Sequence, residues 1–595
     1  MSSLKFSGKT VVITGSGTGI GQAIAKKFAE HGANIVIMGR RKEPLDQTSK
    51  MLTELMASSG SSARVKAYSG VDVADEAGIN LMFESLKKEF GKVDIIVNNA
   101  GVSGPVKTFT NATVKDFREA VAIHLTGTFW TSVSGLGAME KGGKIITIAT
   151  FFTEENRYEQ RPYRFRTPYT AAQGAKNRLA EALAWELAER GIRSISTNPG
   201  PVHSDRIYKT VYPKAAAEFL RVGGYPGLSS VEVEKVTNGA LPLLGEPEDV
   251  VAKGVGQVAA EIGKARGEQT SDGIASIVSG ALAKIQEIAE KIQNNTSKMI
   301  VDGEFLTQEE VADMVMNLCD EKISKLINGR VIPNDRVFYP VKPIVGTAVP
   351  GVKTADVAGK VIVIATSSSA AKDVARVKKL ASKLQTLGAK QVIVLAHSNA
   401  GNSQYSEFHS HSLDFLDETA VSRIFNTART KFGQVDAVVH LTGDYDYNSS
   451  LSGLSRSEWD ALVDNFIYIP GLMTREAVNA MAPVGAVQEP SMFKGSSGNV
   501  IIVGPDAPVG KKISGLIRAR SDVFRGALRP YTATVNQELG DVLGSKMRLF
   551  LVLAGNSEGS EPDAELLETS IISLLSGAGQ RGNEAIFYID EARSK

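Results

Sequence analysis

A glycine-rich segment near the start of the chain has the residue types that bind a phosphate group. In "TGSGTGIG", residues 14–21, glycines stand at positions 15, 17, 19 and 21. Glycine lets the backbone turn sharply and approach a pyrophosphate, whose negative charge is favoured at the N-terminus of the following helix. A glycine-rich loop alone is weak support, but this one lies between two expected strands. The segment therefore predicts a dinucleotide site.

Two arginines after the second expected strand bear on which dinucleotide binds. The chain reads Gly39-Arg40-Arg41, whereas a site for NAD usually places an acidic residue here to hold the ribose hydroxyls. A guanidinium suits a 2′-phosphate instead. We therefore expect NADP(H), with Arg40 as a ligand of its 2′-phosphate. The alternative is a pair of solvated arginines at a strand end.

Further arginines cluster in the middle of the first half of the chain. Arg157, Arg161, Arg164 and Arg166 stand close together, and Arg206 follows later. Guanidinium groups bind carboxylates and phosphates through two parallel hydrogen bonds. Arg164, Arg166 and Arg206 are therefore candidate ligands for a substrate carboxylate or for the phosphates of an acyl-CoA. The alternative is a loop whose charges face water.

These residues need a scaffold of alternating strands and helices. "KTVVITG" and "NIVIMG" are short apolar runs rich in β-branched residues, typical of buried parallel strands, and a helical pattern with Ile24 and Phe28 lies between them. The pattern predicts an α/β fold class with doubly wound parallel sheets. At 595 residues the chain is too long for one ordinary domain, so we expect at least two cores.

Composition argues against several classes of protein. The 67 basic and 65 acidic residues give a formal charge of +2, so we expect neither nucleic acid nor a membrane surface as a partner. The start of the chain lacks an apolar leader, and no run of about 18 apolar residues follows. Cys319 is the only cysteine, and the seven histidines form no cluster, so we expect no disulfide and no metal site. These features are typical of a soluble cytoplasmic protein.

Several motifs, taken in order, resemble the short-chain dehydrogenase/reductase family. They are the glycine-rich loop, Asp72-Val73, "NNAG" at 98–101, Tyr169 and "PGPV" at 199–202. The resemblance covers residues 5 to about 207 and implies a nicotinamide cofactor with hydride transfer to or from a carbonyl. It also implies roles in cofactor binding for Gly15, Ser16, Gly19, Ile20 and Gly21 in the loop, Asp72 and Val73 at the adenine, Asn99, Ala100 and Gly101 at the ribose, and Pro199, Gly200 and Val202 at the nicotinamide.

The catalytic positions implied by the resemblance depart from the family pattern. The family uses Asn, Ser, Tyr and Lys; Tyr169 is kept, but the other positions hold His124, Thr150 and Gln173. A free tyrosine has a pKa of about 10, and in the family the lysine and the charged cofactor lower it. An amide can hydrogen-bond a ribose hydroxyl but carries no charge. We therefore expect slow reduction, in which a neutral phenol donates a proton, rather than oxidation, which needs tyrosinate.

Lys176 is the next lysine along the chain from Tyr169. It lies seven residues away, about 10 Å at the rise of a helix. We therefore do not expect it to replace the lysine that the family has at position 173. The residues alone leave open whether Tyr169 has a catalytic role.

The chain divides into two units. Residues 1–340 form the first, which carries a helical insertion at about 206–306, where the family builds its substrate lid. Residues 341–356 have the proline and glycine content of a linker, and residues 357–595 form the second unit. An internal repeat relates the two units, because "FGKVDIIVNNAG" in the first parallels "FGQVDAVVHLTG" in the second.

The second unit lacks the residues of a cofactor site. Its loop after the first strand reads "ATSSSAAKD", without glycine, and Ser521 and Arg525 stand where the first unit has Tyr169 and Gln173. We therefore expect two tandem Rossmann-like domains. The second is expected to bind no dinucleotide and to act as a structural or dimerising partner.

The tandem arrangement resembles one half of the bacterial bifunctional malonyl-CoA reductase, most of all its C-terminal half. "RPYRFRTPY", "NPGPVHSDRI" and "NGRVIPNDRVF" carry this resemblance. It implies NADPH-dependent reduction of an acyl-CoA or aldehyde, such as malonyl-CoA or malonate semialdehyde, by a homodimer. The replaced catalytic positions keep two alternatives open: a non-catalytic NADP(H)-binding protein, and a structural pseudoenzyme that acts in an assembly.

Overall fold

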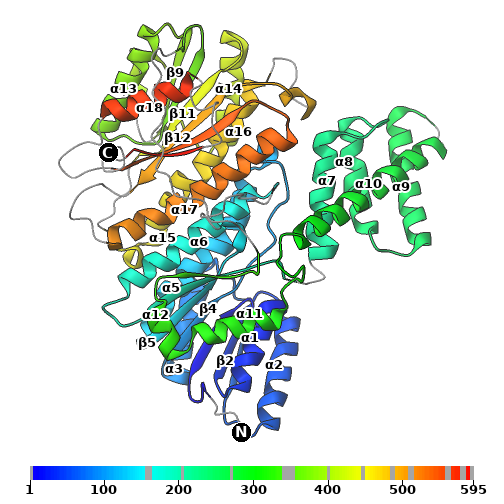
Figure 1. The fold of residues 1–595 in the computed structure, drawn as a ribbon, viewed down its shortest axis with the longest axis vertical. Coiled ribbons are helices and arrows are strands. Elements are labelled where there is room, and N and C mark those ends of the chain that lie inside the picture. Colours follow the sequence, from blue (N-terminus) through cyan, green and yellow to red (C-terminus); the bar gives the residue numbers. More distant parts are fainter. Residues whose placement is uncertain are drawn as a thin grey trace.

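The structure of the chain is a computed structural model. It describes residues 5–153, 164–202, 207–268, 272–337, 356–398, 402–443, 449–482, 490–506, 515–555, 564–576 and 585–589. Two sheets lie towards opposite ends of the long axis, with helices α6 and α17 between them, and a group of helices projects to one side (Figure 1). The expected linker lies outside the described residues except for its last position.

The first sheet is entirely parallel, with the strand order β3-β2-β1-β4-β5-β6-β7. The order reverses between β1 and β4, so the chain leaves these two neighbouring strands in opposite directions and a crevice opens at their carboxyl ends. All five residues of β1 are buried, as expected for a central strand covered on both faces. The strands are β1 Thr10–Thr14, β2 Asn34–Gly39, β3 Val65–Ser69, β4 Val93–Asn98, β5 Met139–Ile148, β6 Arg193–Pro199 and β7 Val331–Asn334.

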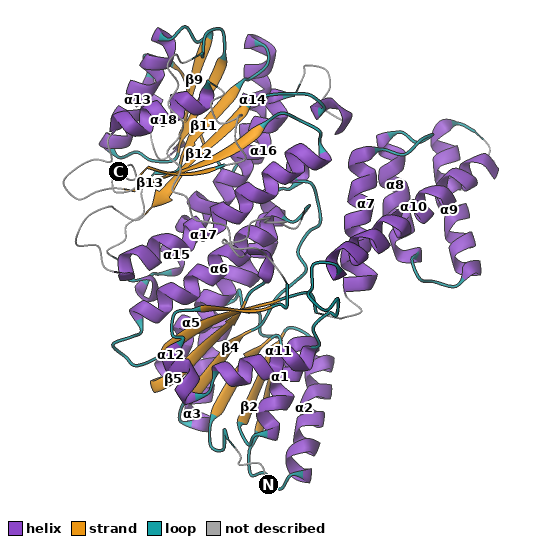
Figure 2. Cartoon of the chain, in the orientation of Figure 1, coloured by secondary structure: helices purple, strands orange, loops and turns teal. Residues whose placement is uncertain are grey.

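Helices cover both faces of this sheet (Figure 2). Apolar residues of α1, α2 and α11 form the core on one face, and those of α3, α5 and α6 form the core on the other. Helix α4 runs into a π-helical turn, Ala122–Thr126, before α5 begins. The helices are α1 Gly19–Glu30, α2 Lys42–Ser58, α3 Glu76–Phe90, α4 Val114–Val121, α5 Gly127–Gly135, α6 Thr167–Glu186, α11 Gln308–Leu318 and α12 Glu321–Leu326.

The second sheet repeats the topology of the first, in the order β10-β9-β8-β11-β12-β13-β14. Its strands are β8 Val361–Thr366, β9 Gln391–His397, β10 His409–Leu413, β11 Ala437–Leu441, β12 Asn499–Asp506, β13 Arg548–Gly555 and β14 Ile586–Ile589. Its helices are α13 Ala371–Thr386, α14 Glu418–Phe432, α15 Arg456–Val463, α16 Ile469–Met481, α17 Gly515–Gln537 and α18 Ala564–Leu575. The prediction of two tandem Rossmann-like domains is confirmed.

The two domains share one apolar core across their interface. The Trp459 ring stacks on Phe129 with 3.8 Å between ring centroids, and its indole N–H donates to the Thr126 hydroxyl at 3.0 Å. Where α6 crosses α17, Gly174 faces Gly526, and a Cβ on either residue would overlap the other helix. The domains therefore pack closely, helix against helix, with the second domain on the helical face of the first.

The helical group between β6 and α11 falls within the stretch expected as an insertion. It comprises a π-helical turn, Ile207–Val211, and helices α7 Tyr212–Gly223, α8 Ser230–Ala240, α9 Glu248–Arg266 and α10 Asp272–Ser297. These helices have an apolar core of their own and stand beside the two-domain body (Figure 1). Across the described ranges, no helix is long and apolar enough to cross a membrane.

Candidate active site

A cleft of about 1010 Å³ opens at the carboxyl ends of the strands of the first sheet. Loops after β1, β2, β4, β5 and β6 line it together with the first half of α6. This is where the strand order reverses, the usual ligand position in such folds. The expected cofactor residues that line it are Gly15, Gly19, Ile20, Arg40, Asp72, Val73, Asn99, Ala100, Gly101, Pro199, Gly200 and Val202.

The glycine-rich loop shapes the cleft through its backbone. Gly15 and Gly19 have φ angles of 65° and 64°, in the left-handed region that favours glycine. A Cβ on Gly19 would meet no atom within 4 Å, so this residue borders open space at the N-terminus of α1. A backbone of this form can approach a pyrophosphate closely.

Two residues expected at the cofactor are not among those that line the cleft. Ser16 is fully buried, and its hydroxyl donates to the carbonyl of Ile13 at 2.8 Å and accepts the N–H of Met38 at 3.0 Å. A Cβ on Gly21 would lie 2.5 Å from the carbonyl oxygen of Gly15. Ser16 therefore joins β1 to β2, and Gly21 lets α1 pack against the turn; a contact of either residue with the cofactor stays a prediction.

Asn99 also serves the fold of the turn. Its side-chain amide donates to the carbonyl of Thr14 at 2.9 Å, and the Thr14 hydroxyl accepts the N–H groups of Asn99 and Ala100 at 3.0 and 2.8 Å. These bonds tie the end of β1 to the end of β4. Asn99 therefore shapes the cleft wall, with its amide engaged by the glycine-rich loop.

Charges of both signs stand at the β2 side of the cleft. The Arg40 guanidinium is 59% exposed and lies 3.7 Å from a carboxylate oxygen of Asp72. An exposed pair of this kind is weak. Arg40 can therefore exchange this contact for a phosphate group, which accepts two parallel hydrogen bonds from a guanidinium.

The four residues at the expected catalytic positions line the same cleft. Tyr169 lies in the first turn of α6, which begins with Thr167-Pro168. Thr150 follows β5, and His124 lies in the π-helical turn. π-Helical turns often occur at functional sites because they change the direction of side chains.

His124 packs against Tyr169. The two rings meet edge to face, with 5.1 Å between their centroids, and His124 Nε2 lies 2.9 Å from the carbonyl oxygen of Val102. That distance fits an imidazole that donates from Nε2. The ring therefore fixes the loop after β4 and one side of Tyr169.

The arginines expected at the substrate separate in the structure. Arg166 is buried, lines the cleft, donates to the carbonyl of Ser103 and lies over the Tyr169 ring, 4.0 Å from its centroid. Arg164 is not among the residues that line the cleft; it pairs with Asp541 of the second domain at 2.5 Å. The charge of Arg164 is used between domains, and its role at the substrate stays a prediction. Arg157, Arg161 and Arg206 lie outside the described residues.

Lys176 lines the cleft, although its spacing from Tyr169 did not lead us to expect it there. Its side chain is 1% exposed and lines the same cleft as Tyr169 and Gln173. Positions i, i+4 and i+7 share one face of a helix, and helical side chains lean towards the N-terminus, so spacing alone could have indicated this. Burial lowers the pKa of Lys176 to about 7.

Gln173 lies between Tyr169 and Lys176 on this face. Its side chain is 3% exposed. Its amide oxygen is buried and has no hydrogen-bond partner among the described residues. A buried acceptor without a partner is costly, so the position fits a ligand that brings a donor, such as a ribose hydroxyl.

The second domain and the insertion hold one wall of the site. Phe165, directly before Arg166, has a φ of 66°, and its N–H donates to a carboxylate oxygen of Glu538 at 2.7 Å. The other oxygen of Glu538 accepts the N–H of Phe109 at 2.8 Å. Glu218 of α7 accepts the N–H and hydroxyl of Thr108 at 2.8 and 2.6 Å. The geometry next to Tyr169 therefore depends on residues far away in the chain.

The equivalent loop of the second domain is filled by its own side chains. The Ser368 hydroxyl donates to Asp373 at 2.6 Å and accepts the N–H of Ala370 at 3.2 Å. Asp373 is buried in the first turn of α13, where a phosphate would otherwise lie. A carboxylate there repels a phosphate, which supports the expectation that this domain binds no dinucleotide in the usual way.

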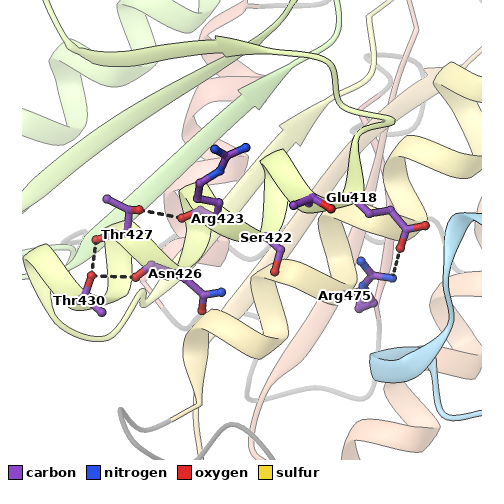
Figure 3. Close-up of a pocket in the computed structure, with 8 residues that line it drawn as sticks. Glu418, Ser422, Arg423, Asn426, Thr427, Thr430 and Arg475 are labelled. Atoms are coloured by element: carbon purple, nitrogen blue, oxygen red, sulfur yellow. Dashed lines mark hydrogen bonds and ion pairs between the residues drawn. The ribbon is translucent and has the colours of Figure 1, made fainter.

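A second pocket, of about 660 Å³, follows α14 on the second domain (Figure 3). Arg475 at its end pairs with Glu418 at 2.7 Å and with Glu476 at 2.8 Å. The hydroxyls of Thr427 and Thr430 donate to carbonyls of their own helix. These groups serve the helix and the domain contact, so the cleft of the first domain is the candidate active site.

Comparisons with known proteins match the first domain. Residues 9–212 match the family model of short chain dehydrogenases. A 3alpha-hydroxysteroid dehydrogenase of Mediterraneibacter gnavus is 31% identical over 243 residues, which are 41% of this chain and 86% of that protein. A 7alpha-hydroxysteroid dehydrogenase of Escherichia coli K12 is 30% identical over 220 residues, which are 37% of this chain and 80% of that protein.

Two solved structures match nearly the whole chain. The C-domain of a bacterial malonyl-CoA reductase with NADP has a TM-score of 0.72 and 15% identity, covering 98% of this chain and 99% of that one. The N-domain with NADP has a TM-score of 0.70 and 16% identity, covering 98% of each chain. The resemblance to malonyl-CoA reductase is confirmed at the level of the fold. The two domains match almost equally, so the fold does not favour the C-terminal half.

Proposed function

Because this chain belongs to the short-chain dehydrogenase family through its first domain, we propose that it binds NADP(H) and reduces a carbonyl group of an acidic substrate. The substrate class that we favour is an acyl-CoA or aldehyde like malonyl-CoA or malonate semialdehyde. The observation that carries the proposal is one cleft that contains both the glycine-rich loop and Tyr169. The bound cofactor supplies a hydride.

The residues at the cofactor end fit a nucleotide with a 2′-phosphate. The N-terminus of α1 and the open backbone at Gly19 suit a pyrophosphate. Arg40 stands at the end of β2 for the 2′-phosphate. The unpaired amide oxygen of Gln173 suits a ribose hydroxyl. Both malonyl-CoA reductase domains with this fold were solved with NADP, which supports the same cofactor here.

The residues at the reaction end support reduction. The Tyr169 phenol donates a proton to the carbonyl oxygen, and the Thr150 hydroxyl donates a second hydrogen bond to the same atom. Arg166, with its charge over the Tyr169 ring, provides a cation near a substrate carboxylate. Without a cation at position 173, we expect the rate to be low.

The second candidate function is a non-catalytic NADP(H)-binding protein or a structural pseudoenzyme in an assembly. The observation in its favour is that two catalytic positions of the family are replaced. Gln173 stands in place of the lysine, and His124 stands in place of the asparagine. It predicts tight cofactor binding, or none, without turnover of any carbonyl substrate. The variant Gln173→Lys distinguishes the two functions. A large gain in turnover would indicate a reductase that lacks only the cation, and no gain would indicate a pocket with another role.

The experiment that tests the proposal is a titration with NADPH and NADH followed by nicotinamide fluorescence. We expect tight NADPH binding that is lost in Gly19→Trp, because an indole would fill the open space beside the loop. Gly60→Trp is the matched control, since Gly60 also has a positive φ and open surroundings but does not line the cleft. Failure of both nucleotides to bind the native chain would contradict the proposal.

A bound cofactor then justifies a search for the substrate. Malonyl-CoA and malonate semialdehyde come first, with the loss of NADPH absorbance as the readout for carbonyl reduction. Tyr169→Phe removes the phenolic proton and is expected to abolish reduction while cofactor binding remains. A turnover that survives in Tyr169→Phe would contradict the assigned role.

We also propose a homodimer in the cytoplasm. The face of α6 opposite the cleft is covered by α17 of the same chain, so a homodimer would use another surface. Light scattering after size exclusion checks the assembly: a mass of one chain would contradict it.

A further inference from the structure

We propose that Lys176 is the group that returns a proton to Tyr169 after each reduction, so that protons move along α6 from Lys176 past Gln173 to the phenol. This inference rests on the proposed function. It gives a role to a buried amine that the reduction described above does not use. The charge that the family has at position 173 would then be supplied by Lys176, one helical turn further along α6.

The three side chains share one face of α6. Tyr169, Gln173 and Lys176 all line the cleft, at the i, i+4 and i+7 positions of one helix. The Cα–Cβ bonds of a helix tilt towards its N-terminus, so the butyl chain of Lys176 extends towards Gln173. The distance of about 10 Å between the Cα positions of Tyr169 and Lys176 is therefore spanned by two long side chains with an amide between them.

Within the described part of the chain, the Lys176 ammonium has no partner that would explain its burial. Among the described residues, no hydrogen bond or ion pair is formed by Lys176, and its pKa is lowered by burial alone. A buried cation without a counter-ion is costly, whereas a structural lysine such as Lys144 pairs with Glu321 at 3.0 Å. The cost is explained if the amine serves the chemistry of the cleft.

Among the residues that the structure describes, the charged and titratable groups that share the cleft leave Lys176 without electrostatic compensation. None of them contributes to the pKa of Lys176, which lies near neutral pH, where an amine can both give and take a proton. These groups are Arg40, Arg41, Asp72, His124, Arg166 and Tyr169.

The proton transfers balance for an aldehyde substrate. When bound, the reduced cofactor would supply the hydride that the carbonyl carbon gains. The carbonyl oxygen would take the phenolic proton of Tyr169, which would yield an alcohol and a tyrosinate. The tyrosinate takes a proton from the Lys176 ammonium through a water molecule that donates to the amide oxygen of Gln173. The neutral amine then takes a proton from solvent.

Proton release on cofactor binding tests this inference without a substrate. The nicotinamide of NADP⁺ is positively charged, so it disfavours a nearby ammonium, whereas that of NADPH is neutral. We expect NADP⁺ to release a fraction of a proton at pH 7, and NADPH to release less, as measured by calorimetry in two buffers of different ionisation enthalpy. Lys176→Met should remove this difference, and Lys144→Met, a buried lysine outside the cleft, should keep it.

The binding heat and the proton count report separate outcomes. Binding of both nucleotides with the same proton release in Lys176→Met as in the native chain overturns the role of Lys176 and leaves the proposed function intact. Absence of binding by either nucleotide overturns both. Removal of an unpaired buried charge does not destabilise the fold, so Lys176→Met is expected to remain folded, which its thermal midpoint verifies.

Kinetics of variants that remove or move the amine provide the second test, once a carbonyl substrate is known. We expect Lys176→Met to lower kcat about tenfold or more with little change in KM, and to remove the fall in rate as pH rises through about 7. The double variant Gln173→Lys/Lys176→Met moves the amine one turn towards Tyr169 and should recover kcat. An unchanged kcat and pH profile in Lys176→Met would overturn the inference.

Discussion

The amide of Gln173 occupies a buried position beside Tyr169 with its oxygen unpaired. A lysine there would bring a positive charge one turn from the phenol and would favour the ionised form of Tyr169. The cleft otherwise keeps a phenol, a hydroxyl and a phosphate-binding loop together. We therefore propose that the rate of this site depends on the position of its cation.

Gln173→Lys should raise kcat for carbonyl reduction by on the order of tenfold, since one pKa unit of stabilisation corresponds to about 1.4 kcal/mol. Single-turnover measurements with NADPH check this. Gln173→Met is the matched control, because it keeps the length of the side chain without charge or hydrogen bonds and should lower the rate. A rate in Gln173→Lys equal to that of the native chain would show that the cation is not what limits the site.

Arg40→Ala should weaken NADPH binding about 10- to 100-fold, because it removes charge-assisted hydrogen bonds to the 2′-phosphate. NADH, which lacks this phosphate, should bind nearly unchanged. Fluorescence titration of both nucleotides measures the effect, with Arg41→Ala as the neighbouring guanidinium for comparison. Equal weakening of NADPH and NADH would refute the assignment of Arg40 to the phosphate.

Helix α6 serves two interfaces at once. One face presents Tyr169, Gln173 and Lys176 to the cleft, while Gly174 faces α17 of the second domain. The backbones approach so closely that a Cβ on Gly174 would overlap the carbonyl oxygen of Gly526 and lie 2.7 Å from Pro530. The position of the face that lines the cleft is thus set by packing on the opposite face.

Gly174→Ala should lower the free energy of unfolding by about 1–3 kcal/mol, because the extra methyl group pushes two well-packed helices apart. Denaturant unfolding followed by circular dichroism measures the change. Gly137→Ala is the control, since a Cβ there would meet no atom within 4 Å and should change stability by less than about 0.5 kcal/mol. Equal effects of the two substitutions would argue against the close helix crossing.

Two glutamates at equivalent positions of the repeat connect the domains of the whole molecule. Glu186, in "ELA", accepts the N–H groups of Leu451 and Ser452 at 2.7 and 3.1 Å, while Glu538, in "ELG", accepts those of Phe109 and Phe165. Arg520 pairs with Glu186 at 2.6 Å. In each domain a glutamate thus accepts two backbone N–H groups of the other domain. Glu186 also pairs with an arginine of the other domain.

The pKa values of the two glutamates move in opposite directions. The pKa of Glu186 is lowered overall. Burial acts to raise it, but the hydrogen bonds from Leu451, Ser450, Ser452 and Arg520 have the larger combined effect. Burial raises the pKa of Glu538 to about 8, although the N–H groups of Phe109 and Phe165 oppose the shift. Glu186 therefore stabilises the fold above its unfolded pKa of about 4.3 and loses this as pH falls. Glu538 stabilises it below that value and loses this as pH rises towards 8.

Glu186→Gln and Glu538→Gln should thus lower the thermal midpoint in different pH windows. The difference between the native chain and Glu186→Gln should be present above about pH 5 and shrink towards pH 4. The difference for Glu538→Gln should be largest near the acid end of the range, at about pH 4, and shrink as pH rises towards 8. Differential scanning fluorimetry from about pH 4 to about pH 9 measures both differences. This range spans the unfolded pKa of a glutamate, about 4.3, and the raised pKa of Glu538. Parallel curves for the two variants would contradict the assignment.

Local patterns in the sequence were sufficient for the fold and for half of the site. The apolar runs of β1 and β2, with the glycine-rich loop between them, specify a strand, a turn and a helix from neighbouring residues. The repeat of "FGKVDIIVNNAG" indicated the second sheet, whose strand order is the same as that of the first. Tyr169 was found for the same reason, because it stands in a short motif at the start of a helix.

Tertiary structure decided which side chains serve the cleft and which serve the fold. Ser16 is used within the turn, Arg164 pairs with Asp541 across the domain interface, and Lys176 is buried beside the residues that motif spacing had assigned to the reaction. Each outcome depends on the direction of a side chain or on a partner hundreds of positions away, as with Glu538 and Phe165. Residue types and spacing determine the local elements, but only the packing of the two domains determines which of these groups meet and which lose contact with water.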